Sequence, residues 1–189
     1  MKNNSLLPLC IAILLCFCFA QCKKTKIEPT ELSKLPAATQ IGANTFGCLV
    51  NGKAWIAQTD CKFLCDAPFK ITYDAGGGGN IAVTGKFINN DLNTDQTLSF
   101  GIDSTNFKNI FDYELLGDAH VGFTYINSKI FNNCRYLLSI DSLTNASGII
   151  HLTRYDLSNG IFSGTFNFNI TKPGCETITV TEGRFDKKL

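Results

Sequence analysis

The sequence is poor in the residue types that most often carry acid–base catalysis. Its 189 residues include only two histidines, and no Gly-x-Ser-x-Gly motif marks a nucleophilic serine. His120 and His151 both fall in strand-like segments, where a histidine is more often a surface residue than a general base. Without a base, serine, threonine and cysteine lack an activator. The sequence therefore predicts a non-catalytic protein without a cofactor, and a hydrolase that uses loop carboxylates stays a weaker alternative.

The chain also lacks an excess of charge of either sign. It carries 17 basic and 16 acidic residues, and residues 1–21 contain one lysine and no acid, which leaves equal numbers in the rest of the chain. Proteins that bind nucleic acid present a basic face to it. The predicted partners therefore exclude nucleic acid.

No apolar run is long enough to cross a bilayer. The longest, Leu6 to Ala20, has about 15 residues, whereas a membrane-spanning helix needs about 20. A positive start at Lys2, a short apolar core and a small residue near its end are typical of a secretory signal. Cys22 follows this core directly, in the stretch "FAQCKK".

The position of Cys22 resembles that of the lipidated cysteine in bacterial lipoproteins. The resemblance implies a signal peptide at residues 1–21 that is removed, and N-terminal acyl chains, palmitate among them, on Cys22. Two or more chains attach a protein stably to a membrane. No acidic block follows Cys22. By the same resemblance this favours the outer membrane and its periplasmic face, and leaves exposure at the cell surface open.

Residues 22–44 show no periodicity and contain Pro29 and Pro36. This composition is typical of a flexible tether, so the predicted domain covers residues 45–189. Within that range apolar and polar residues alternate, for example in "IFSGTFNFNI", which begins at Ile161, and in "TLSFGI", which begins at Thr97. Alternation predicts strands with one buried face in antiparallel sheets. Evenly spaced Gly, Asn, Asp and Ser clusters then indicate a single all-β domain, a β-sandwich or a barrel.

Two local features predict details of pairing. Asn51-Gly52 lies between strand-like runs and predicts a type I′ hairpin, because both residues must take positive φ. That turn pairs Val50 with Lys53, Cys48 with Trp55, and Phe46 with Ala57, which places the only tryptophan on a buried face. Near the end of the chain, Val180 and Phe185 lie on opposite parities. A bulge at Gly183 would return Phe185 to the core.

The stretches "FGCLVNGKAW" and "SGTFNFNI…GCETITVTEGRFD" resemble an uncharacterised family of lipoproteins of the Bacteroidota. Its members carry an all-β domain of unknown function. The resemblance implies the localisation and the fold described above, and it implies no catalytic residue.

Five cysteines follow Cys22, and an exported protein experiences an oxidising compartment in which disulfides persist. An odd number predicts at most two bridges and one free thiol. Zinc bound through the Cys61-x3-Cys65 pair is disfavoured by export and by the lack of a second close pair. No metal is therefore predicted. The disulfide candidates are Cys48, Cys61, Cys65, Cys134 and Cys175.

Three further motifs are weak. Asp91, Asn93 and Asp95 match the start of a calcium loop, but the glycine and the glutamate that should follow are missing. The run Gly76 to Gly79 predicts a loose turn rather than a phosphate loop, because no helix follows it. Ser104 and Ser142, each preceded by aspartate, resemble short O-glycosylation sites of exported proteins of the Bacteroidota.

These observations predict a lipid-anchored protein of the cell envelope that serves as a binding module for a protein or a glycan. A small-ligand carrier of the β-barrel type is the main alternative. An apolar cavity inside the domain would favour the carrier, an exposed aromatic patch would favour a protein partner, and a cleft with two carboxyl groups would favour the hydrolase.

Overall fold

The structure is a computed structural model, and it describes residues 29–60, 66–76, 79–89, 94–102, 112–114, 121–127, 136–137 and 144–189. In these segments the chain forms twelve strands and one short 3₁₀ turn, η1 (Leu32–Lys34), which confirms the predicted all-β class. No helix in the described part of the chain has the length and apolar character needed to cross a membrane.

The first sheet, sheet A, has six strands that all pair antiparallel, in the order β2-β1-β12-β11-β10-β7. Its last three long strands form a meander along the chain. The strands are β1 (Thr45–Val50), β2 (Lys53–Ile56), β7 (Asp112–Glu114), β10 (Asn145–Asp156), β11 (Ile161–Thr171) and β12 (Ile178–Lys188).

The second sheet, sheet B, has the order β3-β5-β6-β8-β9, and β4 also pairs with β5. All its pairs are antiparallel except the two-residue pairing of β3 with β5, which is parallel. The strands are β3 (Gln58–Thr59), β4 (Phe69–Asp74), β5 (Asn80–Asn89), β6 (Thr94–Ile102), β8 (Val121–Asn127) and β9 (Tyr136–Leu137).

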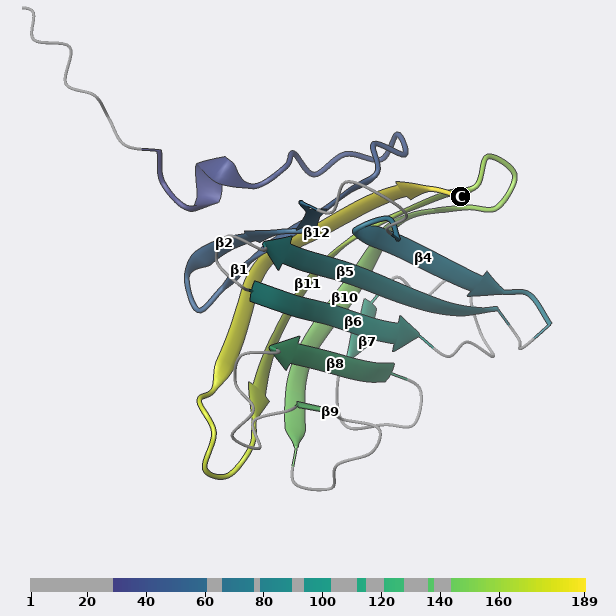
Figure 1. The fold of residues 1–189 in the computed structure, drawn as a ribbon. Helices are drawn as coiled ribbons and strands as arrows, with labels where there is room; N and C mark the ends of the chain where they lie inside the picture. The colour runs from purple at the N-terminus through teal and green to yellow at the C-terminus, as the bar shows by residue number, and fades with distance from the viewer. Residues whose placement is uncertain are drawn as a thin grey trace, which may run out of the picture.

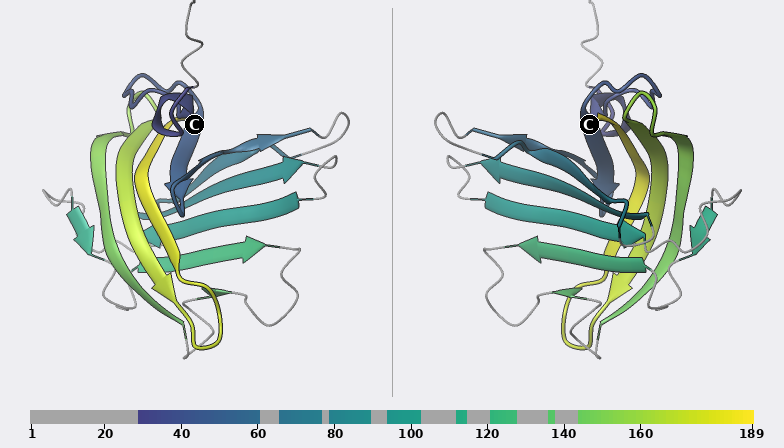
Figure 2. Two further views of the ribbon diagram at one scale, coloured as in Figure 1. Left: turned by 90° about the vertical axis from the view of Figure 1, so that its left-hand side faces the viewer. Right: turned by 90° about the vertical axis from the view of Figure 1, so that its right-hand side faces the viewer.

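The two sheets face each other as a β-sandwich, with strands that cross steeply rather than run side by side (Figures 1 and 2). One corner is made by a single stretch of chain. After β2, at the edge of sheet A, only Ala57 intervenes before β3, which pairs in sheet B. Such a strand that changes sheets is a common corner in orthogonal packings.

Aromatic rings from both sheets fill the space between them. Phe100 on β6 lies 5.0 Å from Phe166 and 5.8 Å from Phe185, measured between ring centroids, and both partners belong to sheet A. Phe46 on β1 stacks on Phe166 at 5.2 Å and also contacts Phe69 of sheet B at 5.4 Å. These rings are at most 4% exposed, so the described inner faces are in direct contact.

The predicted first hairpin is confirmed. Val50 pairs with Lys53 and Cys48 with Trp55, and the amide of Ala57 donates to the carbonyl of Phe46. Asn51 and Gly52 take φ values of 48° and 76°, as a type I′ turn requires. Trp55 is 4% exposed, and its indole N–H donates to the side-chain oxygen of Gln96 in sheet B at 2.8 Å.

The predicted bulge in β12 is also confirmed, with one change of detail. The register slips between Gly183 and Val180, and both Val180 and Phe185 are buried. The residue in the left-handed region is Glu182, with φ of 54°, not Gly183. Gly183 is needed for space, because a Cβ there would lie 2.3 Å from the ring of Phe166.

Residues 30–44, which we call the strap, lie along one end of sheet A (Figure 1). This corrects the predicted tether for residues 30–44, whereas residues 22–28 lie outside the described residues. Glu31 accepts a hydrogen bond from the amide of Ala54 at 2.7 Å, and a Cβ on Gly47 would lie 2.8 Å from the ring of Pro36. The strap has no periodic pattern because side chains and amides of the domain, rather than an apolar face, hold it in place.

Candidate functional site

A buried carboxylate on β12 fastens the strap to sheet A. The side chain of Asp186 accepts hydrogen bonds from the hydroxyls of Thr39 and Ser163, at 2.6 and 2.7 Å. It also accepts three bonds from strap amides, those of Ile41, Gly42 and Ala43, at 2.8–3.0 Å. We call this contact the latch.

The hydrogen bonds of the latch stabilise the charged form of Asp186. Asp186 is 1% exposed. Burial raises the pKa of Asp186, but the hydrogen bonds from Thr39, Ala43, Ser163 and Gly42 outweigh that effect and lower the pKa to about 2. The latch also explains why Ser163 is fully buried although its parity places it on the outer face of sheet A.

Two arginines extend the contact between strap and sheet. A guanidinium nitrogen of Arg154 donates to the carbonyl of Gln40 at 2.6 Å, and one of Arg184 lies 3.5 Å from the carbonyl of Pro36. Ala38, which lies between Pro36 and Gln40 in the strap, stands beside the outer face of sheet A and forms one wall of a hollow.

That hollow has a volume of about 380 Å³ and is open to solvent. Its floor is the β12 bulge, where Gly183 lies against Phe166. Its rim is polar and comes from β11 and β12. The residues that line it are Ala38, Thr165, Phe166, Asn167, Glu182, Gly183 and Arg184.

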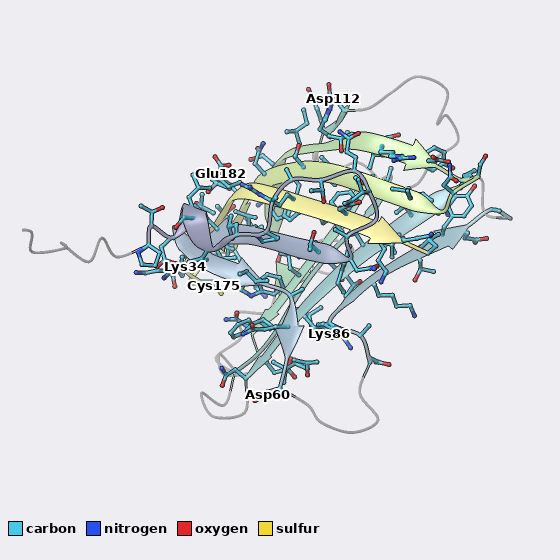
Figure 3. All side chains as sticks on the ribbon, turned by 90° about the horizontal axis from the view of Figure 1, so that it is seen from above. Lys34, Asp60, Lys86, Asp112, Cys175 and Glu182 are labelled. Carbon is cyan, nitrogen blue, oxygen red and sulfur yellow. The ribbon has the colours of Figure 1, made fainter. Side chains whose placement is uncertain are left out.

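The bulge brings an ion pair to the rim of the hollow. Glu182 takes positive φ in this bulge, and its carboxylate accepts from the Arg184 guanidinium at 3.1 Å. The Arg184 Nε–H donates to the Glu182 carbonyl at 3.0 Å. The side chain of Glu182 is 53% exposed and that of Arg184 is 18% exposed, so the carboxylate faces solvent beside a mostly covered guanidinium. Figure 3 shows Glu182 beside the strap.

From the hollow a row of polar residues crosses sheet A to its edge. Arg184 pairs with Thr165, Thr165 with His151, and His151 with Asp112 in the strand register. Asp112 lies at the far side of sheet A from the strap (Figure 3), where its carboxylate contacts Nδ1 of His151. The residues of this pair are 62% and 44% exposed, which agrees with the surface role that the sequence predicts for His151.

The side chains around the hollow can form hydrogen bonds of several kinds. The rim offers a hydroxyl, an amide, a carboxylate and a guanidinium within one concave surface, which suits hydrogen bonding to a polar ligand. A general base has to lie within hydrogen-bond reach of its nucleophile. Among the described residues, the side chain of His151 contacts Asp112, and no side-chain hydrogen bond joins it to Thr165.

Cys48 is removed from the disulfide candidates, since it is a free thiol. Its side chain is completely buried in the aromatic core, and burial raises the pKa of the thiol well above its ordinary value. It therefore packs as a small apolar residue. Cys175 is half-buried against the core and interacts with at least one other residue. The other candidates, Cys61, Cys65 and Cys134, lie outside the described residues.

Several predicted sites also lie outside the described residues: Cys22, Asp91, Asn93, Ser104, His120 and Ser142. Of the glycine run, Gly76 and Gly79 lie between β4 and β5, and Gly77 and Gly78 lie outside the described residues. In the part of the chain that the structure describes, no group of three or more metal-ligating side chains comes together.

Sequence reasoning missed the hollow and the latch. The irregular parity at Gly183 was the only signal for either, and it pointed to the floor of the hollow. Nothing in the pattern "GRFDKK" distinguishes the buried Asp186 from a solvated surface aspartate, because its partners are backbone amides of a segment 143–145 positions away.

Comparison with known proteins adds no relative. No protein-family model matches the chain, and searches of curated proteins and of solved structures found no match.

Proposed function

We propose that the chain is a lipid-anchored protein of the bacterial cell envelope whose β domain binds a glycan, without catalysis, in the hollow on the outer face of sheet A. The anchor is Cys22, and the location is the outer membrane, facing the periplasm. The signal-like start of the sequence supports the anchor. The observation that carries the binding role is the hollow itself, a concave surface beside the strap with polar side chains on its rim.

The chemistry of the rim favours a hydroxyl-rich ligand over a protein partner. Thr165, Asn167 and the Glu182–Arg184 pair supply both donors and acceptors, which sugar hydroxyls need on both sides. Protein interfaces concentrate their energy in aromatic and other large anchors. Among the described residues that line the hollow, Phe166 is the only aromatic one, and it is buried.

The packing of the core disfavours the small-ligand carrier. A carrier of the barrel type holds its ligand in a cavity inside the domain. In the described part of this domain the inner faces of the two sheets meet through rings such as Phe46, Phe100 and Phe166, 5.0–6.4 Å apart. A ligand placed between these rings would have to displace side chains from both sheets.

The binding role is tested with an oligosaccharide array, followed by calorimetry with the best ligand. We expect Asn167→Ala to weaken binding by about 5- to 30-fold, the effect of about 1–2 kcal/mol from lost hydrogen bonds. Asn169→Ala is the matched control, since Asn169 is an exposed asparagine two positions along the same face of β11. Equal affinity in both variants, or binding to proteins alone, would refute a glycan site in the hollow.

The anchor is tested separately, by labelling cells with an alkyne fatty acid. Cys22→Ala should abolish the label and release the protein from the membrane fraction. Cys48→Ala should change neither result, because that thiol is buried in the folded domain. Label and membrane retention that persist in Cys22→Ala would show that the anchor lies elsewhere.

A further inference from the structure

The large apolar side chains that the described residues expose lie at one end of the domain. They are Leu32, Ile41, Leu157 and Leu189, which are 48%, 72%, 50% and 54% exposed. Leu32 and Ile41 belong to the strap. Leu157 belongs to the turn between β10 and β11, and Leu189 follows β12. Figures 1 and 2 show these three segments along the top of the molecule, with η1 at the left and the turn between β10 and β11 at the right of Figure 1.

Contacts between the segments confirm that they form one surface. The amide of Leu189 donates to the carbonyl of Gly160 at 2.8 Å, in the turn that holds Leu157. Next to Ile41, a Cβ on Gly42 would lie 2.8 Å from the Cβ of Lys188. We call this surface, made by residues 30–44, 157–160 and 187–189, the strap end of the domain.

The acidic side chains at the strap end are paired or buried, whereas two of its lysines are not paired with an acid among the described residues. Glu31 pairs with Lys34 at 2.6 Å, and Asp156, beside the turn, pairs with Arg154 at 2.6 Å. Asp186 is buried in the latch. Lys187, whose ammonium lies 5.4 Å from the ring centre of Phe69, and the exposed Lys188 remain. Exposed apolar side chains beside lysines are the combination that interfacial membrane contacts use.

The strap end is also the end at which the chain reaches the proposed anchor. Six residues lie between Cys22 and Pro29, where the described chain begins just before the strap. The distance from Cys22 to Pro29 is therefore at most about 25 Å. An acylated Cys22 would therefore keep the strap end close to the membrane surface.

We propose that the strap end of the domain rests on the membrane, with Ile41 and Leu157 entering the headgroup region and Lys188 meeting anionic lipid. This inference rests on the proposed anchor for its proximity to the membrane, and on the exposed side chains for the contact itself. The contact gives the domain a fixed orientation, in which the turn between β11 and β12 at the opposite end faces away from the lipid (Figure 1).

The contact is tested on the acylated full-length protein in vesicles of phosphatidylethanolamine with 30% phosphatidylglycerol. Each lysine is labelled with a water-soluble amine reagent, with the protein either vesicle-bound or in detergent-free buffer as the Cys22→Ala variant. We expect labelling of Lys188 to slow at least fivefold on the vesicles. Labelling of Lys172, in the turn at the opposite end, should not change. Equal rates for Lys188 in the two states would overturn the proposal.

A second arm keeps the test independent of acylation. Full-length Cys22→Ala is mixed with an excess of the same vesicles and floated on a gradient. We expect a bound fraction that falls at least tenfold when Ile41→Ser and Leu157→Ser are added. The control substitutions Asn169→Ser and Thr171→Ser, also at exposed positions but away from the strap end, should leave it unchanged. Absence of binding, or binding that the first pair does not alter, would overturn the membrane contact. A parent protein that takes up no fatty-acid label in cells would overturn the anchor alone.

Discussion

Phe185 and Asp186 are neighbours on β12 and point to opposite sides of sheet A, into two different kinds of contact. Phe185 joins a core in which each ring touches several others and no single contact has a required direction. Asp186 holds the strap through five hydrogen bonds that converge on one carboxylate. The core contact spreads its stabilisation over many residues, whereas the latch concentrates it in one.

This difference has a consequence for damage. A lost ring leaves a cavity whose neighbours can partly relax into it. A lost carboxylate leaves three amides and two hydroxyls facing each other without an acceptor, and each unsatisfied buried group costs free energy. We therefore expect core variants to lower the stability of the whole domain, and latch variants to act first on the strap.

The largest effect should come from the core side of the comparison. Trp55→Ala should lower the free energy of unfolding by about 3–5 kcal/mol, as large core truncations do, measured by urea denaturation. Native fluorescence of Trp55 should be blue-shifted and poorly quenched by iodide, because the ring is 4% exposed. Gln96→Ala removes only the partner of the indole N–H and should cost about 1 kcal/mol. Unchanged stability in Trp55→Ala would make this residue a surface platform instead.

The latch should show the next largest effect. Asp186→Asn keeps the size of the side chain but presents an NH₂ group where only acceptors fit, and we expect a loss of about 2–4 kcal/mol. Limited trypsin digestion should cut the variant at Lys34 faster than the parent. Asp112→Asn is the control and should cost less than about 1 kcal/mol, because its ion pair with His151 is exposed. A strap that stays protected in Asp186→Asn would mean that the latch is redundant.

The latch also predicts how stability depends on pH. The pKa of Asp186 is about 2 in the folded protein, below the ordinary value of 3.8. Its contribution is therefore fully present above about pH 4 and is lost as the pH falls toward 2. Two pKa units correspond to roughly 2–3 kcal/mol. Asp186→Asn should lose this part of the acid dependence in denaturation series between pH 5 and pH 2, and an unchanged acid profile would contradict the assignment.

A smaller effect is expected at the β12 bulge, which lies between the core and the hollow. Gly183→Ala would place a Cβ 2.3 Å from the ring of Phe166, and overpacking of this kind costs about 1–3 kcal/mol. Gly101→Ala is the matched control, since a Cβ there has only an ordinary contact at 3.7 Å. Thermal denaturation should separate the two variants. If they prove equally stable, the bulge adjusts without strain, and the boundary between core and hollow is softer than the structure indicates.

The smallest effect concerns reactivity rather than stability. The oxidised protein should show one thiol that reacts with a disulfide reagent after denaturation and none before it, because Cys48 is free and completely buried. Cys48→Ala should remove the single signal, with the other four cysteines of the domain in two bridges. Five reactive thiols in the denatured, unreduced protein would contradict those bridges. A native thiol that reacts at once would mean that the core opens readily.

The sequence predicted the core side of this comparison much better than the latch side. Alternation in β11 placed Phe162, Phe166 and Phe168 together, and Asn51-Gly52 set the register of the first hairpin, because both depend on residues close in the chain. Even the bulge near Gly183 followed from parity alone.

The latch side could not be predicted in this way. The strap binds through backbone amides, which every sequence has, so nothing in residues 30–44 signals where they lie. The sequence offered a β-sandwich as one of two architectures, but it did not show where the chain changes sheets, since the step from β2 to β3 occurs within one continuous polar and apolar pattern. Hydrogen bonds between a side chain and distant backbone amides produce no periodic pattern in the sequence.

The central place of β12 in sheet A sets an order of events during folding. β1 pairs with β2 and β12, and Thr39 bonds a carboxylate 147 positions later in the chain. A chain that becomes available from its N-terminal side first can therefore complete neither sheet A nor the latch until β12 is also available. Pairing between such distant segments is intrinsically slow. We expect the chain to stay without a complete sheet A until that moment, so that β12 joins the two halves of the sheet.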